Sequence, residues 1–225
     1  MPWNAGLILG IRISYAEWVN FALILVYNLF VIFYVSKKVY ERWGVYMGRK
    51  CIHFLCGGVS ILLAPYLFDD VFLPVLMCAA MTLLTLFGHL WLGPFKWFQV
   101  EGNYADVYFC IMFTLLVGVF WGYNPWIGIL ACLFMAWGDG ITGVVRNIVY
   151  KRRTKGAWGN LAMILLCVPL GYALLGLVGA IGGVFASVIE KFEFIDDNIS
   201  VPIGSAAVMS LLYTPVVRAA LMSLI

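Results

Sequence analysis

Residues 137–160 read WGDGITGVVRNIVYKRRTKGAWGN, and this stretch decides the predicted fold and the predicted site. Asp139 stands inside an apolar segment, where a carboxylate is costly and is usually kept because it binds something. A cationic run follows from Arg146 to Lys155, and the sequence becomes apolar again at Gly156. A carboxylate beside Lys and Arg at one edge of an apolar segment suits a metal ion bound to a phosphate.

Composition places the chain among helical membrane proteins. Of its 225 residues, 64% are hydrophobic and only 11% are charged, and the mean hydropathy is +0.99. Soluble domains are far less apolar. Apolar runs of about 17 to 25 residues recur, which is the length needed to cross a bilayer core about 30 Å thick. We therefore expect an all-α fold, a polytopic transmembrane bundle in which residues 1–225 form one membrane domain with its motif-bearing core at about 49–204.

The apolar runs predict about eight transmembrane helices. Single helices are expected over residues 15–35, 51–68, 71–92, 105–121, 126–145 and 201–222. The run 158–190 is too long for one crossing, and its glycines allow a break near Gly176 that would give two short helices. Seven helices result if this run folds differently.

The distribution of positive charge predicts the orientation in the membrane. With eight helices, all Lys and Arg residues except Arg12 and Arg218 fall on one face. Cytoplasmic loops are enriched in these residues. We therefore expect this face in the cytoplasm and both termini on the opposite side.

Acidic residues near this face are candidate ligands of a metal ion. The adjacent Asp196, Asp197 and Asn198 offer oxygen ligands in a short loop, and Asp139 offers another. Mg²⁺ takes such ligands and usually keeps waters and phosphate oxygens in its remaining positions. A second interpretation, compatible with the first, makes residues 196–198 the N-cap of the last helix.

Three further charged residues are candidates for phosphate binding or catalysis. Lys155 and Arg146 are placed to bind phosphates, with Lys155 acting as a mobile point charge. Glu190 ends an apolar helix, where a negative charge opposes the helix dipole. This unfavourable position favours a functional role for Glu190.

A basic cluster precedes the second predicted helix. Arg49, Lys50 and His53 lie on one helical face, because residues three and four positions apart are neighbours on a helix. Gly57, one turn further, leaves room for a ligand or for close helix packing. A lone histidine in a membrane is more often a hydrogen-bonded structural residue, so the spacing alone leaves both roles open for His53.

The motifs of soluble nucleotide-binding folds do not occur in the sequence. There is no Walker A loop, no GxGxxG after a strand, no zinc motif and no GxSxG elbow. A nucleotide would therefore bind at the ends of helices. We expect no nucleic-acid partner.

Three motifs together resemble those of the dolichol kinase and phytol kinase-like family. They are RKxxHxxxG at residues 49–57, GD at 138–139 followed by KxxxG at 155–159, and Glu190 followed by DDNxxVP at 196–202. This family is related to the CDP-diacylglycerol synthases. The resemblance implies a polyprenol kinase that uses Mg²⁺ to transfer the γ-phosphate of CTP to a lipid alcohol of the polyprenol, dolichol, geranylgeraniol or phytol type.

The resemblance also implies roles for individual residues. Asp139, Asp196 and Asp197 would hold the metal. The catalytic residues would be Asp139, Lys155, His53 and Glu190. Nucleotide and phosphate binding would involve Arg49, Lys50, Lys155, Gly159 and Asn198, together with Arg146, which the charge pattern and not the resemblance indicates. Either a carboxylate or His53 would orient or deprotonate the lipid hydroxyl.

The chain departs from the family pattern at a few positions. Arg146-Asn147 replaces the usual Gly-Arg pair, and Gly156 and Asn160 stand where Ser is usual. These departures bear on the choice of substrate and nucleotide. The expected location is the cell membrane of a prokaryote or the endoplasmic reticulum of a eukaryote, with the site facing the cytoplasm, and a homodimer is an open arrangement.

Two other functions compete with the kinase. A cytidylyltransferase would join CMP to a lipid phosphate and release pyrophosphate, but the chain lacks the KD pair followed by HGG that such synthases usually carry. A small transporter would use Asp139 and Glu190 as an ion or proton site and would place polar residues near the bilayer midplane. A purely structural role leaves both acids unexplained.

Overall fold

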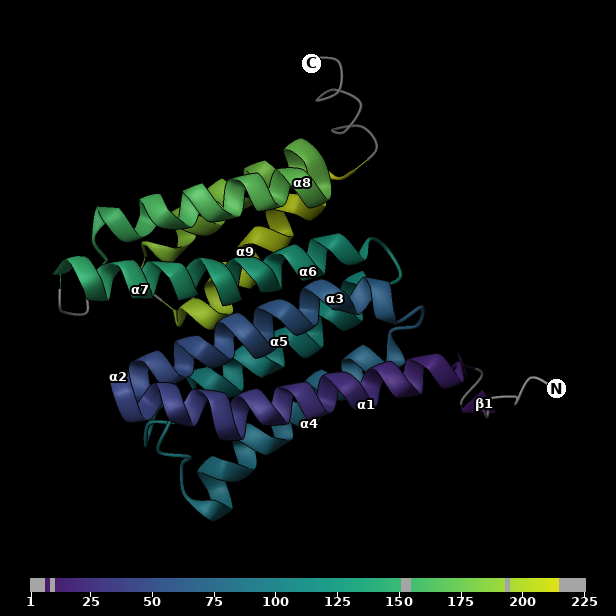
Figure 1. Ribbon diagram of the computed structural model, residues 1–225. Helices are drawn as coiled ribbons and strands as arrows, with labels where there is room; N and C mark the ends of the chain where they lie inside the picture. The colour runs from purple at the N-terminus through teal and green to yellow at the C-terminus, as the bar shows by residue number, and fades with distance from the viewer. Residues whose placement is uncertain (1–6, 9–10, 151–154, 193–194, 215–225) are drawn as a thin grey trace. The chain divides into compact units, whose positions relative to one another are not determined.

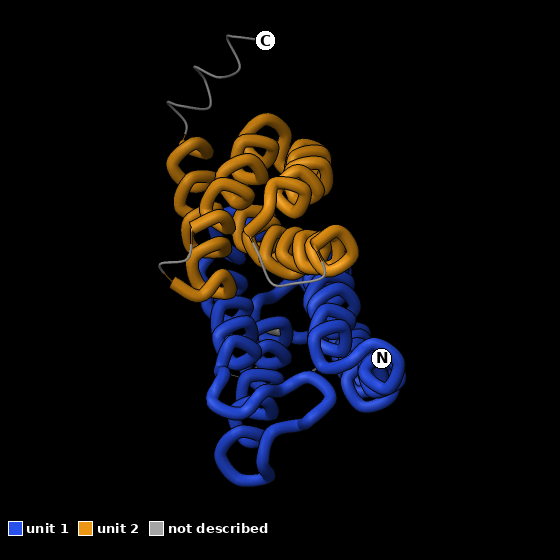
Figure 2. Tube along the Cα trace, turned by 90° about the vertical axis from the view of Figure 1, so that its left-hand side faces the viewer, with its two compact units in different colours: residues 1–125 blue, residues 126–225 orange. Residues whose placement is uncertain are grey.

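The computed structural model describes residues 7–8, 11–150, 155–192 and 195–214, and these residues are almost entirely helical (Figure 1). Within this part of the chain the strands are β1 (Leu7–Ile8) and β2 (Ile11–Arg12), which form a minimal antiparallel pair. The all-α prediction is confirmed. The chain divides into two compact units, Met1–Pro125 (unit 1) and Trp126–Ile225 (unit 2) (Figure 2). The predicted single membrane domain stays a prediction.

Unit 1 begins with a long helical run that starts at a capping box. The run consists of α1 (Tyr15–Phe30), η1 (Val31–Val35), α2 (Ser36–Ile52), η2 (His53–Val59) and α3 (Ser60–Leu67), in which η1 and η2 are π-helical. Ser14 Oγ accepts a hydrogen bond from the Glu17 amide at 3.2 Å, and the Ser14 amide donates to Glu17 Oε2 at 2.8 Å. This reciprocal pair satisfies two backbone donors that the first turn would otherwise leave free.

The run folds back on itself at Gly44. This glycine has φ 80° and ψ 176°, which a residue with a Cβ adopts only with strain. Asn20 Nδ2 donates to the Leu67 carbonyl at 2.9 Å, and Ser60 Oγ donates to Asn28 Oδ1 at 2.8 Å. Because early residues pair with late ones, the two halves of the run are antiparallel.

The sequence predicted a loop where α2 is helical. The cationic stretch between residues 36 and 50 was expected to connect two helices, yet it is helical on both sides of Gly44. Lys and Arg are good helix formers, and their long side chains carry the charge away from the helix axis. The break is therefore one residue long.

The rest of unit 1 is a second antiparallel pair. It consists of α4 (Phe72–Phe87), the π-helical η3 (Gly88–Leu92) and α5 (Ala105–Phe120). The Thr82 and Thr114 hydroxyls are 3.4 Å apart between α4 and α5. Gln99 of the connecting loop donates from Nε2 to Asp106 Oδ2 on α5 at 2.6 Å, and His89 Nε2 of η3 lies 3.0 Å from Asp106 Oδ1.

Unit 2 contains α6 (Pro125–Leu133), the π-helical η4 (Phe134–Gly138), α7 (Asp139–Tyr150), α8 (Ala157–Glu190) and α9 (Asp197–Leu212). Gly176, with φ 61° and ψ −146°, divides α8 into two halves, which confirms the predicted break. The backbones of Gly171 and Gly179 are in close contact across the two halves. The last helix begins at Asp197, four residues before the predicted start.

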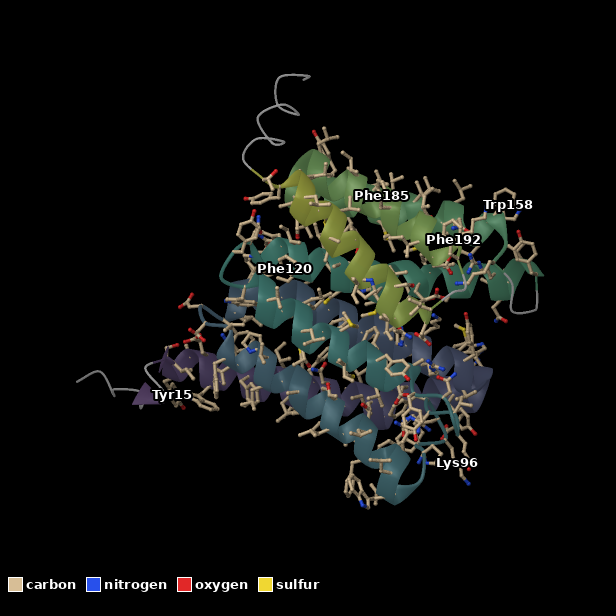
Figure 3. The ribbon with its side chains drawn as sticks, turned by 180° about the vertical axis from the view of Figure 1, so that it is seen from behind. Tyr15, Lys96, Phe120, Trp158, Phe185 and Phe192 are labelled. Atoms are coloured by element: carbon tan, nitrogen blue, oxygen red, sulfur yellow. The ribbon has the colours of Figure 1, made fainter. Side chains whose placement is uncertain are left out.

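Within the part of the chain that the structure describes, four helical segments have the length and composition of membrane spans: Tyr15–Leu67, Phe72–Leu92, Pro125–Tyr150 and Ala157–Glu190. The apolar helix Ala105–Phe120 is shorter. Large apolar side chains such as Tyr15, Trp158 and Phe185 are exposed on the helices (Figure 3), which suits a lipid environment. The prediction of a helical membrane protein is supported, whereas the count of about eight crossings is not established by these lengths.

Candidate functional site

The candidate site lies in unit 2, where the ends of α8 and α9 meet the continuous helix Pro125–Tyr150. Asp139 is the first residue of α7, Lys155 precedes α8, Glu190 is the last residue of α8, and Asp197 is the first residue of α9. Because α8 folds back at Gly176, its start and its end come to the same place. The helical hairpin thus brings together charged residues that are far apart in the sequence.

Three carboxylates form the acidic part of the site. Asp139, Glu190 and Asp197 each offer one oxygen, and these oxygens lie within 4.8 Å of one another. Glu190 is only 1% exposed, whereas the Asp197 side chain is 24% exposed. The group therefore extends from the interior of unit 2 towards its surface.

Two cations bind Glu190. Arg146 Nη1 and Nη2 donate to its two carboxylate oxygens at 2.7 and 2.9 Å. Lys155 Nζ donates to Glu190 Oε1 at 2.9 Å, to the Glu190 carbonyl at 2.6 Å and to Asp197 Oδ2 at 2.6 Å. The bidentate geometry fixes Arg146 in the plane of the carboxylate, while the Lys155 ammonium bridges two acids.

A further set of contacts orients Arg146. Its Nη2 also donates to Asn160 Oδ1 at 3.0 Å, and Asn160 Nδ2 donates to the Ser187 carbonyl at 2.8 Å. The Arg146 side chain lies directly against Gly159, where an added Cβ would collide with it. The structure thus gives Gly159, predicted to bind nucleotide, a packing role that makes room for the guanidinium.

The sequence prediction missed Asn160 and Ser187. Asn160 was noted only as a departure from the family pattern, and Ser187 was not singled out. Each is a polar residue within the apolar run 158–190, and that is the signal by which both could have been found. Only the fold of α8 shows that they face each other.

The charges of the site influence each other's ionisation. Burial raises the pKa of Asp197, as do the nearby carboxylates, and although the Lys155 ammonium opposes the rise, the pKa reaches about 6. Burial lowers the pKa of Lys155, but its hydrogen bonds to Asp197 and Glu190 outweigh burial, so this pKa lies above the usual value. Lys155 is therefore a cation near neutral pH.

The predicted metal ligands 196–198 divide into two roles. Asp196 is the N-cap of α9, because its Oδ1 accepts from the Asn198 amide at 2.9 Å and from Asn198 Nδ2 at 2.8 Å. The second interpretation, an N-cap, is thus correct for Asp196, which is not among the three clustered acids. Asp197 points into the cluster instead.

The residues present fit a divalent cation with hard oxygen ligands. Asp139 and Asp197 supply carboxylate oxygens, the ligands that Mg²⁺ prefers. Among the described residues, the buried Asn198 Oδ1 has no hydrogen-bond partner, so a further oxygen is available beside Asp197. Glu190 is already bound by Arg146 and Lys155, and its structural role is to hold these cations.

The other predicted site residues lie in unit 1. His53 is buried and its ring stacks on Phe109 with centroids 4.1 Å apart, and the Lys50 ammonium lies 5.6 Å from the centre of the Tyr46 ring. Arg49 is half-buried. Their roles in binding nucleotide or in catalysis stay predictions. Lys151, Arg152 and Arg153 of the predicted cationic loop, and also Arg218, lie outside the described residues.

Comparison of the chain with protein-family models, with curated proteins and with solved structures finds no match. The function is therefore inferred from the sequence motifs and the geometry of the site.

Proposed function

We propose that the protein is an Mg²⁺- and CTP-dependent kinase of a membrane lipid alcohol, similar to the polyprenol kinases. The observation that carries this proposal is the convergence of Asp139, Glu190 and Asp197 with Lys155 and Arg146 in unit 2. Phosphoryl transfer needs mainly positioning and neutralisation of charge. Acids for a metal and cations for phosphates are the groups that such a reaction requires.

Each group in the cluster has a distinct part in the proposed reaction. Asp139 and Asp197 would hold Mg²⁺, which when bound neutralises and orients the phosphates of the nucleotide. Lys155 is a flexible cation held between two acids, and its ammonium can turn from Asp197 towards a phosphate oxygen. Glu190 and Arg146, which are locked together by two hydrogen bonds, position Lys155 and do not react themselves.

The position of the cluster supports a reaction at the membrane surface. Glu190 and Asp197 are terminal residues of α8 and α9, and Lys155 lies just before α8. A transporter would place its polar residues near the middle of the spans; in the cluster, Asp139 has such a position within the span Pro125–Tyr150, whereas Glu190, Asp197 and Lys155 do not. The breaks at Gly44 and Gly176 support the proposal of eight crossings, and the excess of Lys and Arg in the predicted loops supports a cytoplasmic site.

Labelled nucleotides test this function. The purified protein in nanodiscs is incubated with Mg²⁺, geranylgeraniol or a longer polyprenol, and CTP or ATP labelled in the γ-phosphate. We expect label in the lipid with CTP and its loss in Asp139→Asn. Asp69→Asn is the matched control, since Asp69 is an exposed acid in unit 1.

Two outcomes contradict the proposal. Transfer of CMP from α-labelled CTP to a lipid phosphate would assign the protein to the cytidylyltransferases. If no label is transferred from either nucleotide to any lipid acceptor, the proposal of an enzyme is wrong. A transport assay in proteoliposomes would then test the rival function.

A further inference from the structure

Unit 1 contains a cavity whose lining residues extend along its helices. Its volume is about 110 Å³, and it is lined from Arg49 and His53 at one end to Phe68 at the other. Fifteen residues of helix separate His53 from Phe68, which corresponds to roughly 20 Å at the rise of an α-helix. A lining that extends this far along one helical run suits an extended chain better than a compact molecule.

The middle of the cavity is mainly apolar, and the polar Asn28 and Ser60 that also line it are hydrogen-bonded to each other. Buried side chains of Ile61, Ala64, Met77 and Phe113 line it. An apolar cavity does not hold water well and takes up an apolar molecule instead, and an empty one forfeits the dispersion contacts of its lining. For a chain with the spans of a membrane protein, the apolar molecules at hand are lipids.

One end of the cavity is polar. Gln99 Nε2 donates to the Thr85 carbonyl at 2.9 Å and to Asp106 Oδ2 at 2.6 Å, so α4 and α5 present Thr85 and Asp106 side by side. His53 stacks on Phe109, which lies one turn after Asp106 on α5. Thr85, Asp106 and His53 all line the cavity and belong to the same end.

The chemistry of this end selects a small head group. Arg49 and Asp106 line it together, so it offers both a donor and an acceptor of hydrogen bonds. Each Asp106 oxygen already has one partner, His89 or Gln99, but a carboxylate has about four acceptor positions. A hydroxyl both donates and accepts, whereas an anionic head group would be repelled by Asp106.

We propose that the cavity of unit 1 binds a long-chain lipid alcohol, with its chain along the apolar lining and its hydroxyl between Arg49 and Asp106. This inference deepens the proposed function and rests on it for the class of ligand, but it concerns binding alone and needs neither nucleotide nor metal. Its failure can therefore be distinguished from a failure of phosphoryl transfer.

Photolabelling measures whether a long-chain alcohol binds and which way its chain points in the cavity. The protein in nanodiscs, without nucleotide or Mg²⁺, is irradiated with two long-chain alcohols that carry a diazirine either beside the hydroxyl or at the far end of the chain. We expect the first probe to modify the peptides around His53 and Asp106, and the second the peptides around Ala64 and Phe68. An excess of unlabelled alcohol should suppress both, and the same amount of fatty acid should not.

A pair of Trp variants on α4, one inside the cavity and one outside it, tests whether the labelled site is the cavity. Cys78→Trp fills the cavity from α4, and we expect labelling to fall about tenfold because overpacking opposes the ligand. Leu83→Trp places the same side chain on α4 at a position that is 66% exposed, and labelling should be unchanged. Ala64→Phe fills the cavity from α3 and guards against a folding defect peculiar to Cys78→Trp.

Three results would overturn the inference. The two probes could modify the same peptides, which excludes a directed chain. Both filling variants, with unfolding transitions like that of the unaltered protein, could label normally, which excludes the cavity. Fatty acid could compete as well as the alcohol, which excludes selection of a hydroxyl.

Discussion

Glu190 is the residue on which the geometry of the site in unit 2 depends. It is almost completely buried, and Arg146 and Lys155 donate three hydrogen bonds to its carboxylate. A buried carboxylate that loses such partners is strongly destabilising, because its desolvation is no longer offset. The same contacts hold Lys155 next to Asp197, so stability and the proposed chemistry share one residue.

Removal of Arg146 tests this dependence. We expect Arg146→Met to lower the free energy of unfolding by about 3–5 kcal/mol, and the double variant Arg146→Met/Glu190→Gln to recover part of the loss, because no buried charge is then left without its guanidinium. Thermal unfolding in detergent measures both.

Lys38→Met is the control for this prediction, since Lys38 pairs with Glu41 at 3.4 Å with both side chains more than half exposed. Such a pair contributes about 0–1 kcal/mol. Equal decreases in the free energy of unfolding for Arg146→Met and Lys38→Met would show that the buried pair stabilises the fold no more than the exposed pair does.

The raised pKa of Asp197 predicts a pH-dependent stability. A pKa of about 6 in the folded chain, against an ordinary value of 3.8, means that the folded state binds more protons between these pH values. Stability should therefore fall as the pH rises from about 4 to 6 and be level above 6 as far as this residue is concerned. Unfolding midpoints in the presence of a chelator measure the trend.

Asp197→Asn removes the titrating group and should flatten this part of the profile. Asp70→Asn, a half-buried acid in unit 1, should leave the slope unchanged. A slope that persists in Asp197→Asn would assign the titration to another group.

At the residue scale, the sequence predicted individual charges better than their partners. Asp139 and Glu190 stand out because charge in apolar sequence is rare, and Lys155 stands out as the end of the cationic run. Asp196 and Asp197 could not be separated, because which one caps the helix depends on the backbone dihedral angles at the start of α9. The Arg146–Glu190 pair was also hidden, since it needs the fold of α8 to bring the residues together.

At the scale of elements, the two helix reversals differ in how visible they are in the sequence. The break at Gly176 was predicted because a membrane span has a limited length. The break at Gly44 was obscured by the surrounding cations, which suggested a longer loop. In both cases a glycine with positive φ makes the reversal, and length alone does not locate it.

Replacement of Gly176 tests the importance of its conformation. The combination of φ 61° and ψ −146° is accessible to glycine and strained for other residues. We expect Gly176→Ala to lower the free energy of unfolding by about 1–3 kcal/mol, measured by thermal unfolding in detergent. In Gly118→Ala, an added Cβ on α5 would lie 3.6 Å from Val75 Cγ2 on α4, an ordinary contact, so stability should be unchanged or slightly higher. Equal effects of the two variants would contradict a strained turn.

At the scale of the whole molecule, composition predicted the class of protein and little about the division of the chain. An apolar content of this size implies helices in a membrane. The division into Met1–Pro125 and Trp126–Ile225 was not predicted from the sequence, because both units are built from similar apolar runs. The resemblance to lipid-alcohol kinases spans this boundary, since its first motif lies in unit 1 and the others lie in unit 2.

The proposed eight crossings fix the side on which each loop is found. Lys96 and Lys191 should lie on one side of the membrane and Tyr123 on the other, because odd- and even-numbered helices end on opposite faces. In a variant without native cysteines, an impermeant maleimide should label Lys96→Cys and Lys191→Cys only in inside-out vesicles and Tyr123→Cys only in right-side-out ones. Restored Cys167, which is fully buried, should react in neither. Labelling of Lys96→Cys and Lys191→Cys from opposite sides would show that one reversal does not occur in the membrane, and the site would then need a different topology.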